Sequence, residues 1–184
     1  MRKVVFGGAN SLDNYFARKD HSTDWLRWSD EVAAVTAAYW KTFDTVLMGR
    51  KTYEVALRHS NGTAPYPDKQ TFVFSRTCTN DAGGAVTIVS TDAAEFVRQL
   101  KRTRAKDICL MGGGELARSF FEAGLIDEIG FNIQPVLLGA GVPLFHEMTR
   151  QIDLKLLECR PFKNGCVFVK YHVNTESPNR RGRS

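Results

Sequence analysis

Apolar and polar residues along this chain follow two alternating patterns, and together they predict a repeated strand–helix order. Short apolar runs, typical of buried strands, are followed by segments in which apolar residues recur every three or four positions, as on one face of a helix. We expect strands at residues 3–8, 45–48, 70–74, 86–89, 107–111 and 128–134. We expect helices from the N-cap Ser29 to near Phe43, from Tyr53 to Leu57, from 92 to about 104, and from 115 to 123.

The last part of the chain has a different pattern. Residues 152–156 and 167–171 alternate between apolar and polar, with Asn164-Gly165 between them as a turn, which is typical of an antiparallel hairpin. The whole order predicts an α/β fold: a mixed sheet, mostly parallel, with an antiparallel C-terminal hairpin and helices on both faces.

Length and charge suggest one domain and a short tail. The chain has 184 residues, 43% of them hydrophobic and 24% charged, so residues 1–174 can form one domain with its own core. Residues 175–184 hold Arg180, Arg181 and Arg183 without an apolar anchor, and we expect a disordered basic tail there. The net charge of +5 indicates a soluble surface rather than nucleic-acid binding, because the basic runs lack interleaved aromatic residues.

Membrane insertion, secretion and metal binding are not indicated. No apolar run approaches the roughly 20 residues that span a bilayer. The start, Met1 to Phe6, lacks a signal-peptide pattern, so we expect a cytoplasmic protein. The four cysteines include no C-x-x-C pair and no accompanying histidine cluster, so we expect no metal site.

Three consecutive glycines, Gly112, Gly113 and Gly114, follow the strand at 107–111 and precede a helix. The first N–H groups of a helix have no partner within it and carry partial positive charge, so a diphosphate is a natural ligand at such a turn. A tight turn without a ligand explains the glycines equally well. The spaced G-x-G-x-x-G fingerprint is absent.

A second strand ends directly before Gly49-Arg50-Lys51-Thr52, and a third before Ser75-Arg76. Cations are disfavoured at a helix start by the helix dipole, so Arg50 and Lys51 favour a bound anion over a merely solvated helix start. The carboxyl ends of parallel strands meet at one edge of a sheet. Three such turns therefore suggest a dinucleotide lying across that edge.

Several of these segments occur, in order, in a known family. They are Ser11–Ala17, Met48–Glu54, Phe74–Arg76, Gly112–Leu116, Leu125–Glu128 and Pro135–Gly141. With them, residues 2–173 resemble the dihydrofolate reductase-like family, and most closely the C-terminal reductase domain of the riboflavin-biosynthesis deaminase/reductase. The resemblance implies NADPH as cofactor and an activity like that of 5-amino-6-(5-phosphoribosylamino)uracil reductase, with hydride transferred to a small nitrogen heterocycle.

The resemblance also implies roles for individual residues. Asp13, on the loop beside the expected nicotinamide, is the candidate catalytic acid or polar anchor, and a loop-capping aspartate is the alternative. Asn132, Gln134 and Trp25 are candidates for substrate binding. The implied cofactor-binding residues are Ala9, Phe16, Gly49, Arg50, Lys51, Thr52, Ser75, Arg76, Met111, Gly112, Gly113, Gly114, Glu115 and Leu116. A homodimer is also implied, with the apolar segment 135–145 as a possible contact surface.

Three departures leave alternatives open. Asn14 stands where the riboflavin branch usually has glycine, and the zinc-binding deaminase half is absent. Dihydrofolate reductases carry a substrate-binding carboxylate on the first helix, and no single acid in residues 24–31 can be assigned that role. The alternatives are dihydrofolate reduction, a non-catalytic NADP(H)-binding module, and a nucleic-acid-binding protein that acts through its arginine-rich tail.

Overall fold

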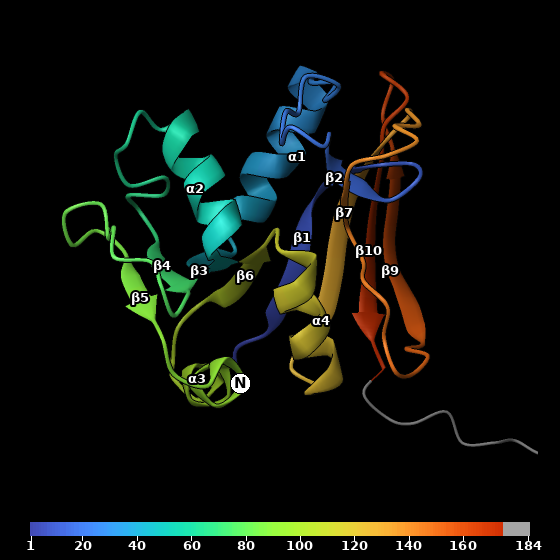
Figure 1. Cartoon of the computed structure of the whole chain (residues 1–184). Helices are drawn as coiled ribbons and strands as arrows, with labels where there is room; N and C mark the ends of the chain where they lie inside the picture. Colours follow the sequence, from blue (N-terminus) through green and yellow to red (C-terminus); the bar gives the residue numbers. More distant parts are fainter. Residues whose placement is uncertain (175–184) are drawn as a thin grey trace, which may run out of the picture.

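The computed structural model describes residues 1–174, and the expected basic tail lies outside them. Eight strands form one sheet in the order β5-β4-β3-β6-β1-β7-β10-β9, and β2 pairs with β8 separately (Figure 1). Their bounds are β1 Val4–Ser11, β2 Tyr15–Ala17, β3 Phe43–Gly49, β4 Gln70–Phe74, β5 Thr87–Val89, β6 Asp107–Met111, β7 Glu128–Gln134, β8 Val142–Pro143, β9 Leu154–Pro161 and β10 Val167–Val173.

The six strands from β5 to β7 are mutually parallel, whereas β10 and β9 run antiparallel at one edge of the sheet. Continuous apolar runs such as Val4–Phe6 and Val46–Met48 are fully buried, as expected for parallel strands covered on both faces. The predicted mixed sheet with an antiparallel C-terminal hairpin is confirmed.

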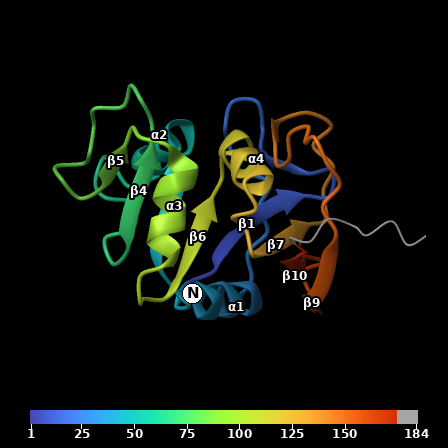
Figure 2. The ribbon, with the colours of Figure 1, turned by 90° about the horizontal axis from the view of Figure 1, so that it is seen from below.

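Within residues 1–174, four helices cover the sheet: α1 (Asp30–Trp40), α2 (Arg50–His59), α3 (Ala93–Lys101) and α4 (Gly114–Glu122). Side chains of α3 and α4 pack with Phe6 and Leu110 in one core cluster. Side chains of α1 and α2 pack with Val5 and Cys109 in another. Neighbouring residues on a strand point to opposite faces, so the two helix pairs lie on opposite faces. Figure 2 shows α1 and α4 on opposite sides of β1.

Several boundaries differ from the sequence prediction: α2 already begins at Arg50, α3 ends at Lys101, and β9 extends from Leu154 to Pro161. Two other differences have a structural reason. The first strand continues to Ser11 rather than ending at Gly8, because Gly8 to Ser11 pair with β7. The first helix ends at Trp40, and Phe43 already belongs to β3, where it packs edge-on against Tyr39. The expected turn at Asn14 is present, and Asn14 adopts a positive φ of 64°.

Candidate functional site

The neighbouring strands β6 and β1 separate at the carboxyl edge of the sheet. They pair only as far as Gly7 and Met111. Beyond that point β1 stays beside β7 to Ser11, whereas the chain after β6 turns into α4. Ligands of open α/β sheets bind outside the carboxyl ends of the strands, where neighbouring connections diverge. The glycine turn 112–114 lies at this point.

Two helices begin here without any side-chain cap. The N-cap of α4 is Gly113 and that of α2 is Gly49, and neither helix start has a side-chain hydrogen bond. In contrast, Ser29 caps α1 and Asp92 caps α3 with their side-chain oxygens. The first N–H groups of α2 and α4 therefore remain available to an external acceptor.

The two uncapped helix starts are in contact with each other. A Cβ atom placed on Gly112 would lie 2.7 Å from Thr52 Oγ1, and one on Gly113 would lie 3.9 Å from the backbone nitrogen of Gly49. Gly112 and Gly113 also have φ values of 59° and 69°, which favour glycine. Residues 49–52 and 112–114 therefore form a single surface, as the sequence predicted. We call this surface the glycine cradle.

The glycine cradle includes two cations, Arg50 and Lys51, and Arg50 already pairs with a carboxylate of the same helix. Arg50 is exposed and its guanidinium donates to Glu54 at 2.6 Å, while Lys51 is exposed. Arg50 and Glu54 also line a hollow of about 320 Å³ together with residues 77–80, which follow β4. The start of α2 and the segment that follows Arg76 thus adjoin one another.

Ser75 stabilises its own turn. Its hydroxyl oxygen accepts hydrogen bonds from the backbone N–H groups of Thr77 at 3.1 Å and Cys78 at 2.9 Å. Among the described residues the hydroxyl hydrogen has no acceptor, so it is available to an anion. Arg76 is exposed.

Ala9 and Phe16 lie near the carboxyl end of β1, on opposite faces of the sheet. Ala9 pairs with Asn132 on the face that α1 covers. Phe16 lies against Gly8 on the other face, and its ring packs edge-on against Phe6 at 5.9 Å between centroids. Both residues lie near the point where β1 and β6 separate, and their contact with a nicotinamide stays a prediction.

Asp13 connects two loops. Its carboxylate accepts hydrogen bonds from the backbone N–H groups of Leu138 at 3.1 Å and Gly139 at 2.7 Å. Together with the Ser11 side chain, these bonds hold the pKa of Asp13 below its ordinary value. Asp13 is therefore an ionised anchor in this conformation, and its role as an acid toward substrate stays a prediction.

The three expected substrate residues differ in their surroundings. Gln134 is buried, and its side-chain carbonyl oxygen accepts from the Arg27 N–H at 2.8 Å and from the Cys166 thiol at 3.3 Å. In contrast, the buried Asn132 Oδ1 and the Trp25 indole N–H have no partner among the described residues. Asn132 is the best placed of the three for a ligand, because it lies beside Ala9.

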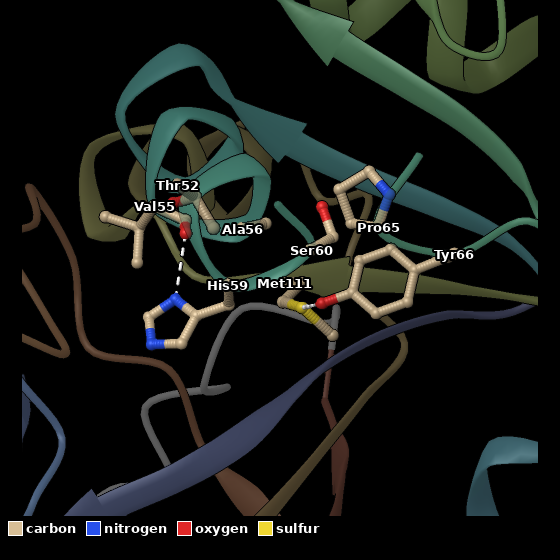
Figure 3. A pocket seen from close by; sticks show the side chains of 8 residues that line it. All are labelled: Thr52, Val55, Ala56, His59, Ser60, Pro65, Tyr66 and Met111. Atoms are coloured by element: carbon tan, nitrogen blue, oxygen red, sulfur yellow. Dashed lines mark hydrogen bonds between the residues drawn. The ribbon is translucent and has the colours of Figure 1, made fainter. Parts of the chain in front are cut away.

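Sequence reasoning missed a cleft of about 370 Å³ beside the glycine cradle (Figure 3). Its walls come from α2, from the loop at Pro65 and Tyr66, and from Met111 at the end of β6. The polar side chains that line it are Thr52, His59, Ser60 and Tyr66. No local signal marks Tyr66, because in the sequence the segment 61–69 has the glycine and prolines of an ordinary loop. His59 lies at the end of α2 and is not marked by any motif.

No helix within residues 1–174 is long and apolar enough to cross a membrane. In the same part of the chain, no three His, Cys, Asp or Glu side chains are grouped so that they could hold a metal ion.

The fold and the glycine cradle define an α/β protein of the dihydrofolate reductase-like class. Comparison with known structures agrees: dihydrofolate reductase from Enterococcus faecalis, solved with NADP(H), superimposes with a TM-score of 0.65 at 15% identity, over 94% of this chain and 96% of that one. More specifically, the chain belongs to the RibD C-terminal domain family, whose model matches residues 2–168. The predicted family is confirmed.

Two relatives of similar length are named as uncharacterized proteins. The uncharacterized Bacillus subtilis proteins YwjB and YyaP are 36% and 31% identical, over 88% and 94% of this chain and 92% and 96% of theirs. A Shewanella sp. PV-4 structure assigned to riboflavin biosynthesis superimposes with a TM-score of 0.80 at 28% identity, covering 95% of this chain and 99% of that one. The deaminase/5-amino-6-(5-phosphoribosylamino)uracil reductase of Thermotoga maritima gives a TM-score of 0.68 at 15% identity, covering 93% of this chain and 56% of that one.

Proposed function

We propose that this protein is an NADPH-dependent reductase that acts on a small nitrogen-heterocyclic substrate. The observation that carries the proposal is the pair of uncapped helix starts in contact with each other, within a family that contains the reductase half of RibD. When bound, NADPH supplies a hydride to an electrophilic carbon of a C=N or C=O group, the heteroatom takes up a proton, and NADP⁺ remains.

The residues present fit this cofactor. Backbone N–H groups at the starts of α2 and α4 would bind the diphosphate, and a side chain at Gly112 would collide with Thr52. Arg50, Lys51 and Arg76, with the Ser75 hydroxyl, would hold the adenosine phosphates. Ala9 and Phe16 would flank the nicotinamide, and Met111, Glu115 and Leu116 would border the diphosphate.

A preference for NADPH over NADH follows from the cations, because the 2′-phosphate is a dianion that a guanidinium neutralises well. The test is a fluorescence titration of the purified protein with both dinucleotides, followed by a search for NADPH oxidation with pyrimidine and pterin acceptors. Saturable NADPH binding at least tenfold tighter than NADH binding would support the proposal. Equal affinities, or no binding, would overturn it.

Dihydrofolate reduction is the less supported alternative. Two of the three acids in residues 24–31 have other partners: Asp24 pairs with Arg18 at 2.7 Å, and Glu31 accepts from the Lys163 N–H at 3.3 Å. Turnover of dihydrofolate would favour this alternative. NADPH binding without oxidation by any acceptor would instead favour a non-catalytic module.

We also propose a homodimer, with β9 as its contact. This edge strand is exposed along its whole length, including Leu154, Leu156 and Leu157. A β-bulge leaves Leu157 without a pairing partner on β10. Lys155 pairs with His172 and Glu158 pairs with Lys170, so Lys155 and Glu158 lie on the same face of the sheet. Two copies of β9 paired antiparallel about a point between Leu156 and Leu157 would set Lys155 of each copy beside Glu158 of the other. Neither side chain has an ion-pair partner within residues 1–174.

The cellular location is a further part of the proposal. All four cysteines are free thiols, including the exposed Cys159, and unpaired cysteines are typical of a reducing compartment. We therefore propose that the protein works in the cytoplasm. We also propose that it acts on a small molecule rather than on nucleic acid, because its family contains the reductase domain of RibD. The tail arginines lie outside the described residues.

A further inference from the structure

The cleft beside the glycine cradle has the position of a substrate site. Thr52 and Met111 line it, and both also border Gly112: Thr52 contacts that glycine and Met111 precedes it in the chain. The cleft lies on the face of the sheet that α1 and α2 cover, which is the face that carries Ala9. Its volume of about 370 Å³ falls in the range of small-molecule sites.

The walls are apolar at their centre and carry four polar side chains, Thr52, His59, Ser60 and Tyr66. Thr52 belongs to the glycine cradle, so the other three are considered as ligand-binding groups. Val55, Ala56 and Met111 provide the apolar part. Tyr66 donates its hydroxyl hydrogen to Met111 Sδ at 2.8 Å, and thioether sulfur is a weak acceptor. A ligand oxygen or nitrogen would be a better acceptor for this hydroxyl. Burial raises the pKa of Tyr66 to about 12, so it stays a donor at neutral pH.

His59 supplies a second polar group. Its Nδ1 lies 2.9 Å from the Val55 carbonyl oxygen of the preceding turn, which fixes the ring and leaves Nε2 without a partner among the described residues (Figure 3). The hydroxyl of Ser60 is already used, because it donates to the Thr63 carbonyl oxygen at 2.6 Å. Tyr66 and His59 are therefore the groups that can orient a ligand.

Among the described residues, no permanently cationic side chain of the kind that neutralises a phosphate lines the cleft. No lysine or arginine is among its lining residues. The nearby Lys69 pairs with Asp68 at 2.5 Å and lies over the Trp40 ring at 5.8 Å, and Arg58 is exposed on α2. A phosphate monoester is a dianion that proteins bind with arginine, lysine or several helix N–H groups. The free helix N–H groups at this edge belong to the glycine cradle, where the cofactor would use them.

We propose that this cleft receives the reducible substrate, and that the substrate is an uncharged, flat heterocycle without a phosphate group, oriented by Tyr66 and His59. The inference rests on the proposed function and narrows its substrate class. A substrate without a phosphate would distinguish this protein from an enzyme that acts on a phosphoribosyl compound.

The test compares two ligands that differ only by the phosphate: 5-amino-6-(ribosylamino)uracil and its 5′-phosphate. Binding of each is measured by calorimetry to the full chain saturated with NADP⁺. We expect the unphosphorylated compound to bind at least as tightly as the phosphate. Tenfold tighter binding of the phosphate, or no binding of either compound, would overturn the inference.

Tyr66→Phe tests the location, because it removes one hydroxyl and keeps the ring. We expect about fivefold to tenfold weaker binding of the uracil, from the loss of one hydrogen bond, with NADPH affinity unchanged. Tyr171→Phe, on the other face of the sheet, is the matched control and should leave both affinities unchanged. Unchanged uracil binding in Tyr66→Phe, with NADPH still bound normally, would overturn the inference but not the proposed function. Failure of the wild type to bind NADPH would overturn the proposed function and this inference with it.

Discussion

The close approach of Gly112 to Thr52 in the glycine cradle can be tested by measuring the free energy of unfolding of a variant. Alanine at position 112 would place Cβ 2.7 Å from Oγ1 and 2.8 Å from Cγ2 of Thr52. It would also adopt a φ near 59°, which costs an L-residue about 1–2 kcal/mol. Overpacking adds about 1–3 kcal/mol. We expect Gly112→Ala to lower the free energy of unfolding by the sum of both effects.

Gly124→Ala is the matched control. Gly124 has a similar φ of 65°, but a Cβ there would meet no atom within 4 Å. The difference between the two variants isolates the collision, and we expect it to be about 1–3 kcal/mol in urea denaturation. Thr52→Ala removes the two closest atoms and leaves only Cβ at 3.4 Å. In that background the extra cost of Gly112→Ala should largely vanish. Equal costs of Gly112→Ala and Gly124→Ala would refute the contact.

Four further outcomes are expected. Arg50→Ala should weaken NADPH binding about tenfold or more, and NADH binding much less, when both are measured by calorimetry. Arg58→Ala, in the last turn of the same helix, is the control and should change neither affinity. Equal losses for both dinucleotides in Arg50→Ala would reject the phosphate role of Arg50. Burial raises the pKa of Glu128, but hydrogen bonds from Lys170 and Lys3 outweigh it, so the folded-state pKa lies below the unfolded one. The ionised Glu128 therefore stabilises the folded state fully above about pH 4.3, and this stabilisation is lost as the pH falls through the folded-state pKa. In Glu128→Gln, the free energy of unfolding followed by circular dichroism should depend less on pH in the acid range. A pH profile like that of the wild type would count against this role of Glu128. Asp13→Ala should speed amide exchange of Leu138 and Gly139, and unchanged rates would mean that Asp13 does not hold these loops together. Leu156→Lys should convert a dimer to a monomer in analytical ultracentrifugation while Leu137→Lys does not, and the opposite result would move the interface to residues 135–145.

Much of the fold could be predicted from the sequence, because the signals that define it are local. The buried strands are continuous apolar runs, and the turns that end them carry glycine or charge. The glycine cradle was predictable for the same reason: Gly112–Gly114 and Gly49–Thr52 each follow a strand, and parallel strands bring their carboxyl ends to one edge.

The substrate side could not be predicted, because its contacts join residues far apart in the chain. Tyr66 meets Met111 across 45 positions, and Gln134 meets Arg27 across 107. No periodicity records such pairs. The internal bonds of Asp13 and Gln134 also depend on loops whose paths the sequence does not specify.

A crystal structure of the protein grown with NADPH would test the central claim most directly. We predict density for the diphosphate against the backbone N–H groups of Gly113–Glu115 and Arg50–Thr52, with the 2′-phosphate near Arg50 and the nicotinamide beside Ala9. Dinucleotide density elsewhere, or a diphosphate that contacts only one of the two helix starts, would contradict it.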